Sequence, residues 1–199
     1  MSTSTPPSNR PLIVGIGGTT RVGSTSERAL AVALDRAIRL GCEVLAFGAG
    51  QMPIEPYDPS RVERSPQAVA LVDALRRADG VIIATPAYHG GISGLVKNTI
   101  DFVEDMRDDP APYFEGRAVG CIVCAEGAQA MGTTLSALRG VVHALRGWPT
   151  PYGATLQSSS DPFGVRSGTP DPMALRACEM VAEEVCRFAQ MTVATRAAG

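Results

Sequence analysis

Hydroxyl side chains and one arginine gather in a short glycine-rich segment near the start of the chain. After the apolar run LIVGI, which begins at Leu12, the sequence reads GGTTRVGSTS over residues 17–26. Small residues let backbone N–H groups approach an anion, hydroxyls can donate hydrogen bonds to it, and arginine adds a forked positive donor. These residue types favour the binding of a phosphate group. The candidate donors are Thr19, Thr20, Arg21, Ser24, Thr25 and Ser26.

A helix is expected directly after this segment. Ser24 and Glu27 have the spacing of a capping box, and the apolar residues of ERALAVALDRAI recur with the period of an amphipathic helix. A helix cap without any ligand would also explain Ser24. It would not explain Arg21 or the density of glycine and threonine before it.

Two common nucleotide-binding motifs do not fit the segment. A dinucleotide fingerprint that starts at Gly15 needs a third glycine where Thr20 stands, and the second strand ends at Phe47 without the acidic residue that holds a ribose. A Walker-type loop needs a GK[ST] sequence, which is absent here. The pattern therefore favours one phosphate held by side-chain hydroxyls, with the rest of the ligand lying across neighbouring strand ends.

A second candidate loop follows the apolar run GVIIAT at 80–85. In TPAYHGGISG the proline and glycines shape a narrow turn, and Tyr88 with His89 could offer flat side chains and backbone amides to a planar ring. An ordinary strand-to-helix turn with a packed tyrosine is the alternative. A third glycine-bearing loop, AEGAQAMGTT at 125–134, follows another apolar run.

Apolar runs alternate with helical patterns along the chain, which predicts an α/β fold. We expect a three-layer, doubly wound parallel sheet of five strands in the order 2-1-3-4-5, whose three glycine-bearing loops converge on one cleft. The expected strands are 12–16, 43–47, 80–85, 118–125 and 152–156. The expected helices are about 24–40, 66–78, 93–106, 132–146 and 171–191.

Length and composition suit one compact domain. The chain has 199 residues, 45% hydrophobic and 19% charged, with a formal net charge of −2 and no basic stripe, so a nucleic-acid partner is not expected. No apolar stretch resembles a signal peptide or a membrane span, and we expect a soluble, cytoplasmic protein. The predicted organisation is a flexible arm at 1–10, the domain at 11–193 and a tail at 194–199.

Neither a metal site nor a catalytic triad is predicted. Cys121 and Cys124 lie three apart on an expected strand, so they should point to opposite faces and cannot chelate one ion, and packing is the better interpretation for all five cysteines. His89 and His143 are the two histidines, and neither has the companions that a triad or a zinc site requires.

Two motifs together resemble the NAD(P)H-dependent FMN reductase family of flavodoxin-like proteins. Gly18 to Ser26 is similar to the family pattern GSxRxxSxN, and residues 85–101 are similar to TPxYxxxxxGxLKNxID through Thr85, Pro86, Tyr88, Gly94, Lys97, Asn98, Ile100 and Asp101. The similarity covers about residues 11–146. Three residues depart from the family pattern. Thr19 stands where the family usually has serine, and Ser26 and His89 stand where asparagine is common.

The resemblance implies FMN as cofactor and NADPH or NADH as co-substrate. Thr19, Arg21, Ser24 and Ser26 would hold the FMN phosphate, with Thr25 beside them. Pro86, Ala87, Tyr88 and His89 would line the isoalloxazine edge, with Gly90 in the same turn. Glu126, Gly127 and Ala128 would lie near the pyrimidine side.

The implied activity is hydride transfer from nicotinamide C4 to flavin N5, which needs no catalytic side chain from the protein. Backbone amides near Gly127 and Ala128 would stabilise charge at the N1 and C2 carbonyl side. The alternatives are a reductase of quinones, azo dyes or metal oxyanions that keeps its flavin, a flavodoxin-like electron carrier, and a nucleotide sensor without activity. A flavin-dependent monooxygenase is the implied recipient of reduced FMN. The helix GISGLVKNTIDFVEDM is expected to form the interface of a homodimer or homotetramer.

Overall fold

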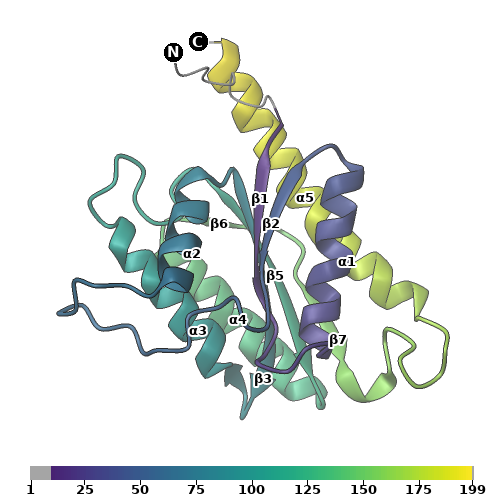
Figure 1. The fold of residues 1–199 in the computed structure, drawn as a ribbon. Coiled ribbons are helices and arrows are strands. Elements are labelled where there is room, and N and C mark those ends of the chain that lie inside the picture. Colours follow the sequence, from purple (N-terminus) through teal and green to yellow (C-terminus); the bar gives the residue numbers. More distant parts are fainter. Residues whose placement is uncertain (1–9, 199) are drawn as a thin grey trace.

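A parallel sheet forms the middle layer of the computed structural model, which describes residues 10–198 (Figure 1). The main path of the sheet has the order β2-β1-β3-β5-β6, and every pair along it is parallel. Two further strands pair off this path, β4 antiparallel to β3 and β7 parallel to β5. The strands are β1 (Leu12–Gly17), β2 (Glu43–Phe47), β3 (Gly80–Tyr88), β4 (Gly91–Ile92), β5 (Ala118–Ala125), β6 (Trp148–Pro149) and β7 (Ala154–Gln157).

The predicted fold class is confirmed, with a difference at one edge. The five predicted segments lie in the predicted order, but the sheet has seven strands because two short strands, β4 and β6, were not predicted. β6 pairs with the start of β5 and β7 with its end, so the two share one edge position. Pro149 and Pro151 explain this division, since proline cannot donate a ladder hydrogen bond.

The helices agree with the predicted periodic segments except at their ends. Helix α4 begins at Ala128 rather than near 132. Gly132, which was expected to precede the helix, therefore lies inside it. Helix α5 ends at Ala198, so residues 194–198 of the predicted tail are helical. The helices are α1 (Thr25–Arg39), α2 (Pro66–Arg77), α3 (Gly94–Asp101), which continues as the 3-10 helix η1 (Phe102–Met106), α4 (Ala128–Ala144), the 3-10 helix η2 (Ser158–Ser160) and α5 (Pro172–Ala198).

The predicted N-terminal arm lies outside the described residues except for its last one. Arg10 donates hydrogen bonds to the carbonyls of Gly41 (2.9 Å) and Cys42 (3.2 Å), just before β2. This arginine therefore holds the entry into β1 beside the entry into β2.

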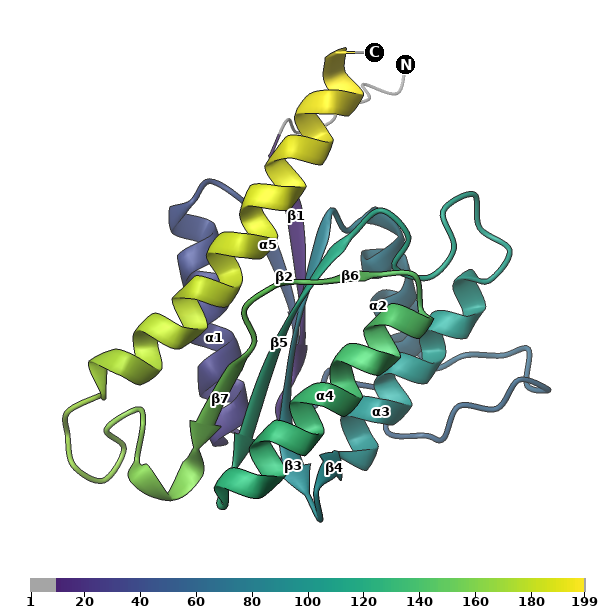
Figure 2. The same cartoon turned by 180° about the vertical axis from the view of Figure 1, so that it is seen from behind.

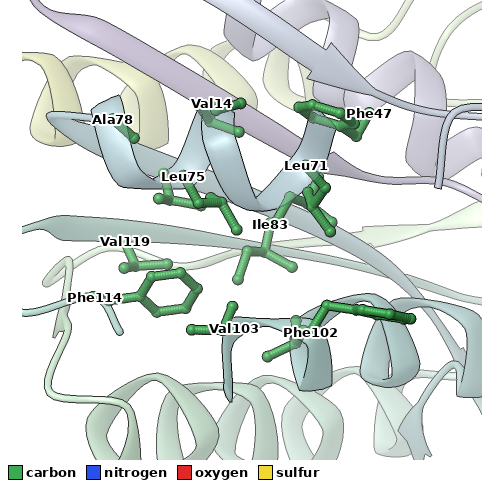
Figure 3. Close-up of a cluster of buried hydrophobic side chains, with 14 of the residues drawn as sticks. Val14, Phe47, Leu71, Leu75, Ala78, Ile83, Phe102, Val103, Phe114 and Val119 are labelled. Carbon is green, nitrogen blue, oxygen red and sulfur yellow. The ribbon is translucent and has the colours of Figure 1, made fainter. Parts of the chain in front are cut away.

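Helices cover both faces of the sheet. Figures 1 and 2 show α1 and α5 on one face and α2, α3 and α4 on the other. Side chains alternate between the two faces along each strand, and in β3 Val81 and Ile83 belong to the cluster under α2 while Ile82 and Ala84 belong to the cluster under α1 and α5. Figure 3 shows the first cluster, in which side chains of α2 and η1 meet those of β1, β3 and β5. Burial on both faces explains why β1, β3 and β5 read as continuous apolar runs.

Three glycines let α1 and α5 approach the sheet closely. A Cβ atom on Gly15 would lie 2.7 Å from Leu34 of α1, and one on Gly120 would lie 2.4 Å from Val181 of α5. A Cβ on Gly80 would likewise lie 2.6 Å from a valine of α5. Leucine side chains of α1 and valine side chains of α5 fill the space that these glycines leave.

The long segment after β2 is held down by one arginine. Arg64 donates two hydrogen bonds of 2.7 Å to the carboxylate of Asp105 and lies over the ring of Tyr57, 4.9 Å from its centroid. Two more hydrogen bonds from Arg64 go to the carbonyls of Asp58 and Arg61. The segment between β2 and α2 is therefore fastened to η1.

Candidate functional site

A cavity of about 400 Å³ opens at the carboxyl ends of the parallel strands. It brings together the three predicted loops after β1, β3 and β5, together with a serine that follows β7. Loops after parallel strands meet at one edge of such a sheet, and this edge is where ligands bind in open α/β folds. The lining residues are Thr19, Arg21, Ser24, Thr25, Ser26, Pro86, Ala87, Tyr88, Cys124, Ala125, Glu126, Gly127, Ala130 and Ser158. We call this space the first cavity.

The loop after β1 leaves the sheet through two glycines. A Cβ atom on Gly17 would lie 2.2 Å from the carbonyl oxygen of Ala84, so only glycine fits beside β3 at this point. Gly18 has φ +100°, a conformation that side chains disfavour, and its N–H donates to the same carbonyl over 3.1 Å. The loop is thus fastened to β3 before its hydroxyl-bearing part begins.

The end of this loop is organised by Ser24 and Glu27. Ser24 is the N-cap of α1 and its Oγ accepts the N–H of Glu27 over 3.3 Å, as the predicted capping box requires. The Glu27 carboxylate differs from the standard box, because it accepts the N–H of Gly23 and, over 3.2 Å, that of Ala49. Glu27 therefore joins the loop after β1 to the loop after β2.

Several donors of the loop remain available to a ligand. Among residues 10–198 the Arg21 guanidinium has no hydrogen-bond partner, while the Arg21 backbone N–H donates to Thr19 Oγ1 over 3.0 Å. The hydroxyl of Ser26 is buried, and its contact with the Ser24 hydroxyl is 3.5 Å, the outer limit of a hydrogen bond. A buried hydroxyl with so weak a partner at the N-terminus of a helix suits an anion that would complete its hydrogen bonding.

The loop after β3 is a tight hairpin. His89 (φ 54°) and Gly90 (φ 79°) form the two-residue turn between β3 and β4, in which Tyr88 pairs with Gly91. Pro86, Ala87 and Tyr88 line the first cavity, whereas His89 and Gly90 are not among its lining residues. Tyr88 is 55% exposed, and among residues 10–198 it is the one aromatic side chain that lines the first cavity.

The loop after β5 presents the start of α4. Gly127 is the N-cap and has no side-chain hydrogen bond to the helix, so the first backbone N–H groups of α4 lack an internal partner. Glu126 and Gly127 line the first cavity, and the lining continues at Ala130 rather than at the predicted Ala128. This N-terminus offers positive partial charge to the first cavity.

Four lining residues were missed by the sequence analysis: Cys124, Ala125, Ala130 and Ser158. The first two end β5, and Ser158 follows β7 directly. The rule that ligands meet the carboxyl ends of parallel strands would have indicated these three. Ala130 lies in the first turn of α4, which begins at Ala128 rather than near 132, and no local signal marks it.

The cysteines lie as predicted. Cys121 packs in the cluster under α4 and Cys124 in the cluster under α5, so the two point to opposite faces. All five cysteines are free and buried. Burial raises the pKa of the Cys124 thiol, which leaves a neutral group beside the first cavity. Between residues 10 and 198 no group of three histidine, cysteine or acidic side chains is placed to hold a metal ion.

Comparison with known proteins points to flavin enzymes. Residues 11–160 match the family described as NADPH-dependent FMN reductase. A quinone reductase of Escherichia coli is 33% identical over 100 residues, which is 49% of this chain and 53% of that protein. An FMN-dependent NADPH-azoreductase of Staphylococcus aureus is 30% identical over 114 residues, which is 55% of this chain and 57% of that protein.

The fold resembles that of an NADH:FMN oxidoreductase (EMOB), solved in its apo form. The TM-score is 0.65 at 20% sequence identity, and the alignment covers 90% of this chain and 88% of the other. The chain spans little more than half the length of the two relatives named above. In the part of the chain that the structure describes, no helix combines the length and apolar character needed to cross a membrane.

Proposed function

Since the chain belongs to the NADPH-dependent FMN reductase family, we propose that it binds FMN in the first cavity and reduces it with NADPH or NADH. The observation that supports this most is the uneven distribution of polar groups around the first cavity. The loop after β1 contributes hydroxyl groups and the Arg21 guanidinium, which has no hydrogen-bond partner among residues 10–198, and the loops after β3 and β5 contribute Tyr88 and the start of α4. A volume of about 400 Å³ is within the range of small-molecule sites.

The phosphate would lie in the loop after β1. Thr19, Ser24, Thr25 and Ser26 supply hydroxyls from a loop whose backbone is already fastened to β3, and Arg21 supplies the positive charge. Ser26 would gain a strong hydrogen-bond partner in place of a contact of 3.5 Å. Little ordering cost would remain, because Glu27 and the Ser24 cap hold the loop without the ligand.

The ring system would lie between the loops after β3 and β5. Pro86, Ala87 and Tyr88 would form one wall, while His89 and Gly90 would support it by closing the hairpin. Glu126 and Gly127 would lie at the pyrimidine side, with Ala128 contributing the first backbone N–H of α4. These N–H groups would stabilise negative charge at the N1 and C2 carbonyl side.

When bound, FMN supplies the hydride-accepting N5 atom, and the protein supplies placement and electrostatics. No side chain of the first cavity needs to act as a nucleophile. Burial keeps the Cys124 thiol protonated, so it does not compete as one. The open side of the first cavity, beside the half-exposed Tyr88, is where the nicotinamide would stack.

The test is anaerobic stopped-flow mixing of the FMN-loaded protein with NADPH and, separately, with NADH. We expect the visible flavin absorption to bleach with at least one of the two in a single-exponential phase. Absence of bleaching with both would remove the proposed activity. Binding of FMN without bleaching would favour an electron carrier.

Quinones and azo dyes are the second class of acceptor. The related quinone reductase and azoreductase favour this possibility. Steady-state assays with free FMN and with menadione separate the two roles, since an enzyme that releases reduced flavin saturates with added FMN. An enzyme that keeps its flavin saturates with the quinone instead.

Assembly and location complete the proposal. An apolar groove between α3 and α4, lined by Ile100, Val141 and Leu145 among others, supports a homodimer or homotetramer formed through α3. Light scattering at micromolar concentration tests this, and a monomer would contradict it. The proposed compartment is the cytoplasm, and a flavin-dependent monooxygenase is the proposed recipient of any reduced FMN that is released.

A further inference from the structure

A second cavity of about 200 Å³ adjoins the phosphate end of the first. The two cavities share Arg21, Thr25 and Ser158 as walls. Its far side is formed by the segment between β7 and α5, which Figures 1 and 2 show at the same end of the sheet at which α1 begins. The second cavity is therefore the nearest described space for a part of a ligand that extends past the phosphate end of the first.

The second cavity carries an excess of positive charge. Arg21, Arg28 and Arg166 line it, against Asp161 as its acidic group. Arg28 Nε donates to the carbonyl of Gly23 over 3.0 Å, and Arg166 Nη2 donates to the carbonyl of Ser159 over 2.7 Å. These bonds fix the two side chains and leave further N–H groups of each guanidinium for an anion.

The carboxylate of Asp161 accepts hydrogen bonds from the backbone of its own loop rather than pairing closely with the arginines. The Asp161 carboxylate accepts the backbone N–H groups of Val165 (2.9 Å), Arg166 (3.0 Å) and Ser167 (2.8 Å). These hydrogen bonds hold the pKa of Asp161 below its usual range. The carboxylate lies 4.0 Å from Arg166 Nε, at the limit of an ion pair, so Arg166 keeps charge to offer.

Apolar side chains line the same space. Phe163 is half-buried against the cluster under α1 and α5, and Val165 is exposed beside it. Guanidinium groups next to an aromatic ring suit a ligand that has both a phosphate and a heteroaromatic base. A free inorganic anion would use the arginines and leave the apolar wall unused.

We propose that the second cavity binds the phosphate-bearing adenosine half of the pyridine dinucleotide. This inference rests on the proposed function, because the nicotinamide would stack above the flavin in the first cavity while the adenosine phosphates lie past Arg21. Arg28 and Arg166 would then contact the dinucleotide, and Arg21 would lie between its phosphates and that of FMN. Arg166 is accordingly a binding residue for the co-substrate and not for the flavin.

The test is calorimetric titration of the FMN-loaded protein with ADP-ribose and with its 2′-phosphorylated form, which lack the nicotinamide. We expect Arg166→Gln to weaken binding of the phosphorylated fragment about five- to tenfold, as the loss of one charge-assisted contact predicts. Arg107→Gln is the matched control. The Arg107 side chain is 64% exposed and that of Arg166 is 69% exposed, and each is paired with one acidic side chain. Equal affinities of wild type and Arg166→Gln for both fragments would overturn the inference.

Two further measurements separate this inference from alternative explanations of the second cavity. Arg166→Gln should raise the KM for NADPH with kcat and FMN affinity unchanged, and Arg166→Lys should recover part of the loss. If Arg166→Gln weakens FAD instead of the ADP-ribose fragments, the second cavity takes the second phosphate of a flavin, which contradicts the proposal. Repeating the titration without FMN distinguishes failure of this inference from failure of the proposed function. If the protein does not bind FMN but still binds the ADP-ribose fragments in a way that depends on Arg166, only the proposed function is removed.

Discussion

Arg117 and Arg21 lie at opposite ends of the same sheet, and the protein uses them in opposite ways. Arg117 precedes β5 at its amino end, is 7% exposed, and donates hydrogen bonds to the carbonyls of Ala78, Tyr113, Glu115 and Arg76. Arg21 follows β1 at its carboxyl end, and within residues 10–198 its guanidinium donates to no group.

The difference shows how one fold separates stability from binding. At the amino end the carbonyls of two connections, α2 to β3 and η1 to β5, would lose this donor if Arg117 were absent, so this arginine works as an internal cross-link. At the carboxyl end the backbone is satisfied by Ser24 and Glu27, and the remaining donors face the first cavity. Substitutions at the two ends should therefore change different measurable quantities.

The largest expected effect on folding belongs to Arg117→Met. The free energy of unfolding should fall by about 3 kcal/mol, because several carbonyl groups lose a charged donor in a buried place. Urea denaturation measures this. Arg21→Gln is the matched change at the other end and should leave the unfolding free energy within about 0.5 kcal/mol of the wild type. Equal destabilisation by both variants would contradict the division of roles.

Asp105→Asn tests the arginine that holds the segment after β2. Hydrogen bonds from Arg64 lower the pKa of Asp105, so its contribution to stability is present above the ordinary aspartate pKa of about 3.9 and is lost as the pH falls through the lowered value. At pH 7 we expect a loss of about 1 to 2 kcal/mol. Unfolding measured from pH 7 to pH 2 should show the two proteins converging in acid, and a constant gap would count against the pairing.

Ser24→Ala should affect both quantities, because Ser24 caps α1 and also lines the first cavity. We expect a loss of about 1 kcal/mol in stability and a weaker affinity for FMN. Ser65→Ala is the control, since Ser65 caps α2 through the N–H of Ala68 and lies outside the first cavity. It should lose a similar stability with FMN affinity unchanged, and a parallel loss of FMN affinity would mean that the effect is only structural.

The smallest expected effect is the reactivity of the cysteines. Burial raises the pKa of Cys121 to about 12 and that of Cys178 to about 12, so neither forms a thiolate near neutral pH. A thiol reagent at pH 8 should label neither residue in the folded protein and both in guanidinium chloride. Rapid labelling of Cys121 in the native state would show that β5 is not closed on the face covered by α4.

The sequence was sufficient where the signal is local. β2 and β5 have the predicted bounds because each is a clear apolar run. β5 is buried on both faces, whereas β2 is an edge strand that is mostly exposed. The Ser24 cap follows from its spacing to Glu27. The placement of Cys121 and Cys124 on opposite faces follows from the period of a strand.

The rest depends on contacts between distant segments. The edge formed by β6 and β7 has too few residues in each strand to show a period, and its pairing is decided by β5. Ser158, Arg28 and Arg166 meet only because the segment before α5 folds back to the start of α1. His89 and Gly90 were assigned to the site from the residue types of their turn and from the family resemblance, and the hairpin turn they form places them beyond the lining of the first cavity.

The central claim is that the loop after β1 holds the phosphate of FMN, and comparing FMN with riboflavin tests it most directly, since riboflavin lacks that phosphate. Flavin fluorescence titration gives both dissociation constants for wild type and for Arg21→Gln. We predict that the wild type binds FMN far more tightly than riboflavin, and that Arg21→Gln reduces this preference about tenfold with riboflavin affinity unchanged. Equal affinity of the wild type for the two flavins, or a preference that survives Arg21→Gln intact, would contradict the account.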